Sequence, residues 1–309
     1  MVLVAGSANL DFVVRAQRIP TPGQTVLGHS VQTFPGGKGA NQAVACARAG
    51  GVRTEMVLAL GRDAYAMPLK ESLQGAGVLL HAQEFAETAS GTAFICVSDE
   101  AENAITVAPG SNNLLGPEHL PALEGFRYML MQLEIPMPTV LDYARRARAA
   151  GLQVALNAAP AQTLEPQLIS LIDILIVNEG ELRALTHSSG SLLEAMAQLP
   201  CETVVVTLGA RGVVARNKAS LHYQTGFSVA AVDTTGAGDT FCGALIAQLA
   251  CHATIETALR YASAAAALSC TKPGAQSSIP KADAVTQFLV SAAPPDASAL
   301  DDLRRYCGA

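Results

Sequence analysis

Short apolar runs recur along the chain, and most are followed by a stretch with helical periodicity. Runs of this length that are almost wholly apolar are typical of strands buried on both faces. Strands are expected at residues 2–5, 55–60, 128–132, 154–157, 174–177 and 203–207. Helices are expected at residues 39–49, 69–74, 139–150, 179–185, 238–251, 255–269 and 282–289. This alternation predicts a doubly wound α/β fold, with a mostly parallel sheet and helices on both faces.

Two segments interrupt this pattern with β-prone residues. Residues 11–36 carry Pro20, Pro22 and Gly23 between short strand-forming pieces. Residues 86–108 contain a hairpin pattern, with strands expected at 92–97 and 104–107. We expect the two segments to form one small β-sheet beside a single α/β domain of residues 1–309. A further hairpin is expected at 213–215 and 221–223, and the tail after residue 293 has no assigned role.

The composition is that of a folded protein without strong charge. Of the 309 residues, 50% are hydrophobic and 15% are charged, and the net charge is −6. Nucleic acid is not an expected partner, because binding it needs a basic surface and no dense Lys/Arg stripe is present. The seven cysteines include no C-x-x-C pair, so neither a zinc ribbon nor a disulfide framework is expected. The chain has no basic leader and no apolar stretch of about 18 residues, so we expect a cytoplasmic protein.

Residues 233–239 carry the strongest chemical signal, with the sequence Asp-Thr-Thr-Gly-Ala-Gly-Asp. They follow an expected strand end at 229–232 and precede an expected helix. Gly236 and Gly238 allow backbone amides to point into one space, where the helix N-terminus adds partial positive charge. That arrangement predicts an anion hole for a phosphate in transfer. Asp239 could then accept a proton from an attacking alcohol, although an aspartate here could also simply cap the helix.

A second glycine-rich segment covers residues 36–41, with the sequence Gly-Gly-Lys-Gly-Ala-Asn. It does not match the spacing of a Walker A motif, so a P-loop is rejected. Its glycines permit close approach to a ligand, while Lys38 and Asn41 offer donors, and the alternative is a flexible turn. Asn9 and Asp11 alternate just after the first strand, where both could face one pocket and bind hydroxyl groups. The alternative there is an Asx-turn.

Three further positions follow expected strands. Asn178 and Glu181 come directly after residues 174–177 and could hold magnesium near nucleotide phosphates, although helix capping is an equal alternative. Residues 207–212 form a glycine turn that could line a nucleotide site or be a plain hairpin loop. Glu134 is a lone acid after residues 128–132. The six histidines have no metal-ligand spacing, and none is assigned a function.

Together these motifs resemble the ribokinase branch of the PfkB sugar-kinase family. The resemblance covers about residues 2–288 and rests on two signatures, at 34–43 and 233–241, with Asn178-x-x-Glu181 between them. It implies that Asp239 is the catalytic base and that the amides of Gly236, Ala237 and Gly238 form the anion hole. It implies ribose-contacting roles for Asn9, Asp11, Gly37, Lys38, Asn41, Glu134 and Asp239. It implies nucleotide-binding roles for Asn178, Thr207, Gly209, Ala210, Arg211, Gly212, Gly238 and Ser263, with Glu181 binding magnesium through water.

The resemblance also implies an activating potassium ion beside the anion hole. The matching positions are Asp233, Thr235, Ser269, Lys272, Gly274 and Ser278. Two departures from the family pattern are Ser263, where an adenine-contacting His or Asn is frequent, and Arg62, where an acidic residue is frequent.

The implied reaction is transfer of the ATP γ-phosphoryl group to the 5-hydroxyl of D-ribose, with Mg²⁺ and K⁺. Kinases acting on deoxyribose, fructose or nucleosides such as pseudouridine are alternatives, as is a catalytically silent sugar-binding regulator. The family fold has a β-sheet lid that often pairs between subunits. A lid formed by about residues 11–36 and 86–108, and a homodimer through it, are therefore expected.

Overall fold

The main sheet has nine strands in the part of the chain that this computed structural model describes, residues 1–100, 102–293 and 296–309. Their order is β13 (Ser220–Thr225), β12 (Gly212–Asn217), β11 (Thr203–Thr207), β10 (Ile174–Asn178), β9 (Gln153–Asn157), β8 (Tyr128–Met131), β1 (Val2–Ala5), β4 (Thr54–Gly61) and β5 (Leu79–Phe85). The pairs from β11 to β5 are parallel, and the hairpin of β12 and β13 is antiparallel. This confirms the predicted fold class.

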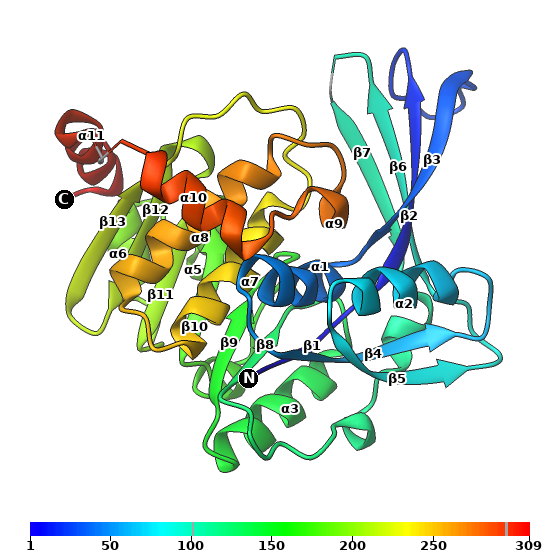
Figure 1. The fold of residues 1–309 in the computed structure, drawn as a ribbon, viewed down its shortest axis with the longest axis horizontal. Helices are drawn as coiled ribbons and strands as arrows, with labels where there is room; N and C mark the ends of the chain where they lie inside the picture. The colour runs from blue at the N-terminus through cyan, green and yellow to red at the C-terminus, as the bar shows by residue number, and fades with distance from the viewer. Residues whose placement is uncertain (101, 294–295) are drawn as a thin grey trace.

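Helices cover both faces of this sheet (Figure 1). One face packs against α1 (Lys38–Val44), the π-helix η1 (Ala45–Ala49), α2 (Ala66–Gly75), α7 (Ala237–Ala250), α8 (Ile255–Ser269) and α10 (Ala282–Ser291). The other face packs against α3 (Met137–Ala149), α4 (Pro166–Ile169), α5 (Glu179–Thr186), α6 (Leu192–Ala197) and α11 (Ala297–Cys307). Two hydrophobic cores result, because strand residues alternate between the two faces.

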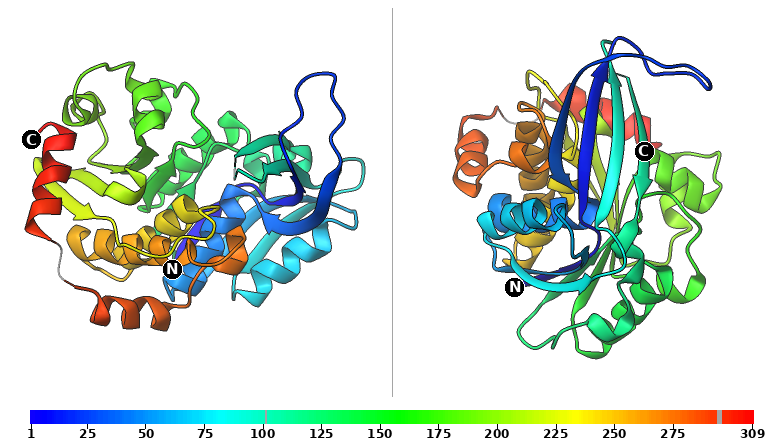
Figure 2. Two further views of the ribbon diagram at one scale, coloured as in Figure 1. Left: turned by 90° about the horizontal axis from the view of Figure 1, so that it is seen from above. Right: turned by 90° about the vertical axis from the view of Figure 1, so that its right-hand side faces the viewer.

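A second sheet of four strands projects from the α/β body (Figures 1 and 2). Its order is β3 (Gly28–Gly36), β2 (Asn9–Ala16), β6 (Gly91–Ser98) and β7 (Asn103–Ala108). The chain enters it from the end of β1 through only three residues and leaves it at Gly36, directly before α1. The small sheet therefore joins the body at the carboxyl ends of the main-sheet strands.

One expectation for the second half of the chain needs correction. Residues 229–232 are not a strand: Val232 is 68% exposed, and its amide donates to the carbonyl of Cys270 at 2.7 Å instead of to a neighbouring strand. The apolar pattern predicted a strand, but this run pairs with no strand among the described residues and lies at the surface. The tail, which had no assigned role, forms α11. Leu303 and Cys307 of this helix are buried in the hydrophobic core on the sheet face that α3, α4, α5 and α6 also cover. None of the helices in the described residues is long and apolar enough to cross a bilayer.

Helix α7 approaches α1 and η1 so closely that Gly243 has no room for a side chain. A Cβ atom added at Gly243 would lie 2.5 Å from the carbonyl oxygen of Gln42 and 2.9 Å from the amide nitrogen of Cys46. Both are backbone atoms, which cannot move without shifting a helix. The first turn of α7 is thus held in a fixed position against α1.

We expect Gly243→Ala to lower the free energy of unfolding by about 1–3 kcal/mol, the usual cost of overpacking. Gly75→Ala is the matched control, because no heavy atom lies within 4 Å of a Cβ added there. That change should be neutral or stabilise by up to about 1 kcal/mol. Urea denaturation of both variants checks the prediction, and equal effects would show that the α7–α1 approach is not tight.

Candidate active site

A cavity of about 170 Å³ lies where β9, β10 and β11 end and α7 begins. Open α/β sheets bind their ligands at this edge. The cavity brings together residues from separate motifs of the sequence: Lys38, Asn178, Glu181, Thr207, Gly236, Gly238 and Asp239. The lining also includes Asn157, Ala159, Ile176, Val177 and Cys242. Residues expected to bind a sugar and residues expected to bind a nucleotide therefore share one space.

The first turn of α7 has the geometry of an anion hole. Gly236 is the N-cap residue, with a left-handed φ of 74° that favours glycine. The Ala237 amide donates to the carbonyl of Thr234 at 3.2 Å, whereas no backbone acceptor among the described residues meets the amides of Gly238 and Asp239 at the helix N-terminus. Because α7 is 14 residues long, its dipole also favours negative charge there.

Asp239 does not cap the helix. Its side chain is 9% exposed, and its two oxygens accept hydrogen bonds from Asn41 Nδ2 and Gln42 Nε2, both at 2.9 Å. Burial, with a smaller contribution from Glu134, raises the pKa of this carboxyl overall, although the Lys38 ammonium and the two amides act in the opposite direction. The carboxylate is thus placed at the anion hole by α1, as a proton acceptor must be.

Lys38 and Glu134 lie beside Asp239. The Glu134 carboxylate accepts a hydrogen bond from the backbone amide of Lys38 at 3.1 Å and another from the Ser7 hydroxyl at 2.5 Å. Burial lowers the pKa of Lys38, but Asp239, Glu134 and Glu181 more than offset this and raise it overall. Lys38 therefore stays protonated among three carboxylates.

Asn9 and Asp11 start β2 and sit two residues apart on one side of the strand, as predicted. Asn9 is 3% exposed, and its Oδ1 accepts a hydrogen bond from Asn112 Nδ2 at 2.8 Å. Asn112 lies in η2 (Gly110–Leu114) and also bonds both backbone groups of Ala8. Burial raises the pKa of Asp11 to about 7, with further contributions from Glu134 and Asp239. Asn9 and Asp11 are not among the residues that line the cavity, although Asp11 lies near enough to both acids for their charges to act on it.

Asn178 and Glu181 form a reciprocal capping box at the start of α5. The amide of Asn178 donates to Glu181 Oε2 and the amide of Glu181 donates to Asn178 Oδ1, both at 2.8 Å. Asn178 and Glu181 therefore do cap helix α5, as the alternative interpretation had it, and both also line the cavity. No hydrogen bond from the described residues reaches Glu181 Oε1, so this oxygen can accept one from a metal-bound water.

The loop after β11 lies partly outside this cavity. Thr207 lines it, whereas Gly209, Ala210, Arg211 and Gly212 do not, and Ser263 is half-buried in the middle of α8. Arg211 instead stacks on Tyr306 of α11, with 4.4 Å from Cζ to the ring centroid. The Tyr306 hydroxyl donates to Glu179 at 2.7 Å, so α11 contacts both the start of α5 and the turn after β11.

Three of the residues expected to surround potassium are brought together. Asp233 Oδ1 accepts from the amide of Thr235 at 2.9 Å, and Asp233 Oδ2 accepts from the amide of Gly274 at 2.9 Å. Burial would raise the pKa of Asp233, but these hydrogen bonds lower it overall. Lys272 bonds the carbonyl of Ser269 through its amide, and the Ser278 hydroxyl donates to Ala275. The Asp233 carboxylate thus joins the 233–235 turn to Gly274 through two backbone N–H groups.

Several neutral amides in the site carry no role in the sequence-based prediction. Gln42, Asn157 and Gln132 form a buried chain that ends at Asp239, and Asn112 holds Asn9. Gln42 lies inside the second glycine-rich signature, and Asn157 ends a predicted strand at the ligand edge. Gln132 likewise ends the strand expected at residues 128–132, so these three positions were the available signals, whereas nothing in the sequence indicates Asn112.

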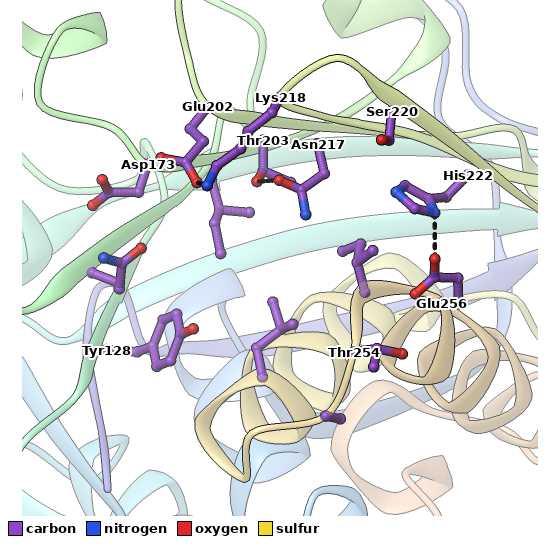
Figure 3. A pocket seen from close by; sticks show the side chains of 15 residues that line it. Tyr128, Asp173, Glu202, Thr203, Asn217, Lys218, Ser220, His222, Thr254 and Glu256 are labelled. Atoms are coloured by element: carbon purple, nitrogen blue, oxygen red, sulfur yellow. Dashed lines mark hydrogen bonds and ion pairs between the residues drawn. The ribbon is translucent and has the colours of Figure 1, made fainter.

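A larger cavity of about 550 Å³ lies at the opposite ends of the strands (Figure 3). Tyr128, Asp173 and Thr203 mark the starts of β8, β10 and β11, and His222 pairs with Glu256 at 2.9 Å. Its lining mixes acids and bases and includes none of the predicted site residues. The chemistry therefore belongs to the smaller cavity.

A profile of the pfkB family carbohydrate kinases matches residues 1–282. The chain belongs to this family. It is 38% identical to the ribokinase of Haemophilus influenzae over 298 residues, which cover 93% of this chain and 97% of that protein. Among solved structures, the ribokinase of Thermotoga maritima is 35% identical with a TM-score of 0.88, over 94% of this chain and 99% of that one. The Arabidopsis thaliana ribokinase complexed with ribose and ATP is 31% identical with a TM-score of 0.86, over the same shares.

Membership in the pfkB family confirms the resemblance that the two glycine-rich signatures predicted. It identifies the protein as a phosphotransferase that acts on a sugar hydroxyl. Helix α11 lies beyond the residues that the family profile matches, so its contacts with Glu179 and Arg211 are an addition to the family domain.

The raised pKa of Asp11 predicts that this residue makes the protein less stable as the pH rises. Its carboxyl has a pKa of about 7 in the folded protein and an ordinary value near 3.8 when unfolded. The folded protein therefore binds the proton more tightly, and the stability this contributes below about pH 4 is lost as the pH rises towards 7. At pH 8, Asp11→Asn should therefore unfold at a higher denaturant concentration than the unchanged protein. Its free energy of unfolding should be higher by at most about 4 kcal/mol. The difference should shrink towards pH 4, and a constant difference would contradict the assignment.

Proposed function

We propose that this protein transfers the γ-phosphoryl group of ATP to the 5-hydroxyl of D-ribose. The observation that carries the proposal is the placement of buried Asp239 at the N-terminus of α7, in a cavity that Lys38, Asn178 and Thr207 also line, with Asn41 bonded to its carboxylate. The similarity to ribokinases, including one complexed with ribose and ATP, supports the choice of both substrates.

Asp239 accepts the proton of the attacking hydroxyl. Phosphoryl transfer depends mostly on positioning and on stabilising the charge that spreads over the phosphoryl oxygens. The amides of Gly236, Ala237 and Gly238 supply N–H donors where this charge develops, and the helix dipole acts in the same direction. The hydroxyl proton goes to the carboxylate while its oxygen bonds the γ-phosphorus and the bond to the leaving ADP breaks.

The sugar-binding proposal rests on polar groups that start β2, start α1 and follow β8. Carboxylates accept hydrogen bonds from hydroxyl groups, and amide and ammonium groups donate to hydroxyl oxygens. A site built to bond each hydroxyl discriminates against a sugar that lacks one, because its buried partner is then unpaired. The proposed ribose contacts are Asn9, Asp11, Gly37, Lys38, Asn41 and Glu134.

The nucleotide is proposed to bind along the ends of β10 and β11 and the loop that follows, with Ser263 of α8 towards the base. Glu181 would hold magnesium through water, and the ion would neutralise phosphate charge when bound. The proposed nucleotide contacts are Asn178, Thr207, Gly209, Ala210, Arg211, Gly212 and Ser263.

We further propose that potassium binds behind the anion hole, among Asp233, Thr235, Ser269, Lys272, Gly274 and Ser278. The Asp233 carboxylate supports this potassium site, because it joins the 233–236 loop to residue 274. A cation bound beside Asp233 would stiffen the loop that leads into the proposed anion hole. Bound potassium adds positive charge close to the transferring group.

The four-stranded sheet is proposed to act as a lid over the sugar, closing to exclude water. It carries several exposed apolar side chains, including Val31 at 64%, Phe94 at 54% and Ile105 at 55%. Exposed apolar surface of this kind supports pairing of two lids in a homodimer, which the molar mass in solution would test.

The experiment that tests the function is an ATP-coupled assay with ribose, deoxyribose, fructose and pseudouridine. Ribose should have the highest kcat/KM, because each missing or displaced hydroxyl leaves a polar group unpaired. Turnover of another compound without ribose would retain a kinase and reject the ribose assignment. Binding of ribose without phosphorylation of any compound would favour the silent regulator.

In the same assay, Asp239→Asn should lower kcat by a factor of about 10²–10⁴, the range for loss of a general base. Ribose binding should change little, since the amide keeps the shape of the carboxyl group. Near-normal turnover would exclude Asp239 as the base.

Replacing potassium with tetramethylammonium should lower kcat for ribose, because the larger ion does not fit among loop carbonyls. Asp233→Ala should remove most of this response, whereas Asp283→Ala, which removes an exposed acid at the start of α10, should keep it. Equal rates of the unchanged protein in both salts would reject the potassium site.

A further inference from the structure

Gln42 is fully buried between α1 and α7 and is not among the residues that the family signatures assign to substrate. Its Nε2 lies 2.9 Å from Asp239 Oδ1 and 3.0 Å from Asn157 Oδ1, and its Oε1 accepts a hydrogen bond from Gln132 Nε2 at 2.6 Å. Every polar atom of this side chain therefore has a partner inside the protein.

The orientation of the side-chain amide groups in this hydrogen-bonded chain is fixed, because the chain ends at groups that can only accept hydrogen bonds. Asn157 Nδ2 donates to the backbone carbonyl of Ile176 at 3.1 Å, so Asn157 must present Oδ1 to Gln42. The facing groups of Asn157 and Asp239 are then both acceptors, which requires Gln42 to turn its NH₂ group towards them. A reversed Gln42 would place three oxygen atoms together. The chain thus delivers an N–H to the Asp239 carboxylate.

A second chain serves the other oxygen of the same carboxylate. Ser72 of α2 donates to Gln276 Oε1 at 2.6 Å, and Gln276 Nε2 donates to Asn41 Oδ1 at 3.1 Å. Asn41 Nδ2 then donates to Asp239 Oδ2 at 2.9 Å. A protonated Asp239 oxygen would lose part of its acceptor capacity towards these fixed donors, so both chains favour the ionised form.

We propose that Gln42 is a positioning residue for the catalytic base, which it holds ionised and fixed in orientation at the anion hole. The proposal rests on the proposed role of Asp239 as base. Gln42 offsets the effect of burial, which acts against a charged carboxylate. Other charged or titratable groups also face Asp239, and all of them stay in place when Gln42 alone is changed: Lys38, Glu134, Asp11, Glu181 and Cys242.

The test is the pH dependence of kcat for Gln42→Met, which keeps the shape of the side chain and removes its donors. The acid limb of the profile should move up by about one to two pH units, the size expected for loss of one hydrogen bond to a charged group. On the acid side of both limbs, kcat should therefore be about 10- to 100-fold below that of the unchanged protein at the same pH, while KM for the sugar and for ATP should change by less than about twofold.

Gln132→Met is the matched control, because it breaks the same buried chain one bond farther from Asp239. It should lower stability by a similar amount but leave the acid limb near its normal pH, since Gln42 still donates to Asp239. An acid limb that is unchanged in Gln42→Met, or that moves equally in both variants, would overturn the proposal.

If Gln42→Met does not fold, Gln42→Glu supplies the same test with a near-identical shape. It places a second carboxyl against Asp239 Oδ1, and because two adjacent carboxylates resist joint ionisation, the acid limb should again move to higher pH. A normal limb in folded Gln42→Glu would also overturn the proposal. Full turnover by Asp239→Asn would instead refute the base assignment itself, so the two failures can be told apart.

Discussion

The structure depends on keeping one buried carboxylate charged. The proposed role of Asp239 as base requires an anion, yet this residue lies in the interior and close to other acids. Burial alone would protonate it, because a charged group in a low dielectric loses its hydration. The Lys38 ammonium and two amide donors oppose this effect. The site is therefore a balance between desolvation and a few fixed dipoles and charges.

Packing keeps those dipoles fixed. Asn41 and Gln42 lie on α1, Asp239 lies on α7, and the hydrogen bonds between them depend on the distance between the two helices. The lack of space at Gly243 sets that distance through direct backbone contact, one turn along α7 from the base. A loosely packed helix pair would let the carboxylate turn away from its donors. The tight helix packing and the electrostatics of the base are thus two parts of one arrangement.

Much of the fold and part of the site followed from the sequence. Buried strands and helices have strong periodic signals, so the parallel sheet was predicted, and the residues of the two glycine-rich signatures do meet, because Lys38, Gly236, Gly238 and Asp239 line one cavity. The strand expected at 229–232 was wrong because an apolar run does not say whether a partner strand exists. Asn112 was missed because its neutral amide has no local signal, and its role depends on residues about 100 positions away in the sequence.

The same logic explains why the amide-rich layer behind the base is made of Asn and Gln and not of charged residues. A second lysine against Asp239 would form an ion pair and weaken the carboxylate as a proton acceptor, while an apolar layer would favour the neutral acid. Neutral amides donate hydrogen bonds without adding net charge, and in a buried chain each donor is paired with an acceptor. They thus hold the base ionised while leaving it basic. Lys38 supplies the cation on the open side of the cavity, where the phosphates are proposed to arrive with compensating negative charge.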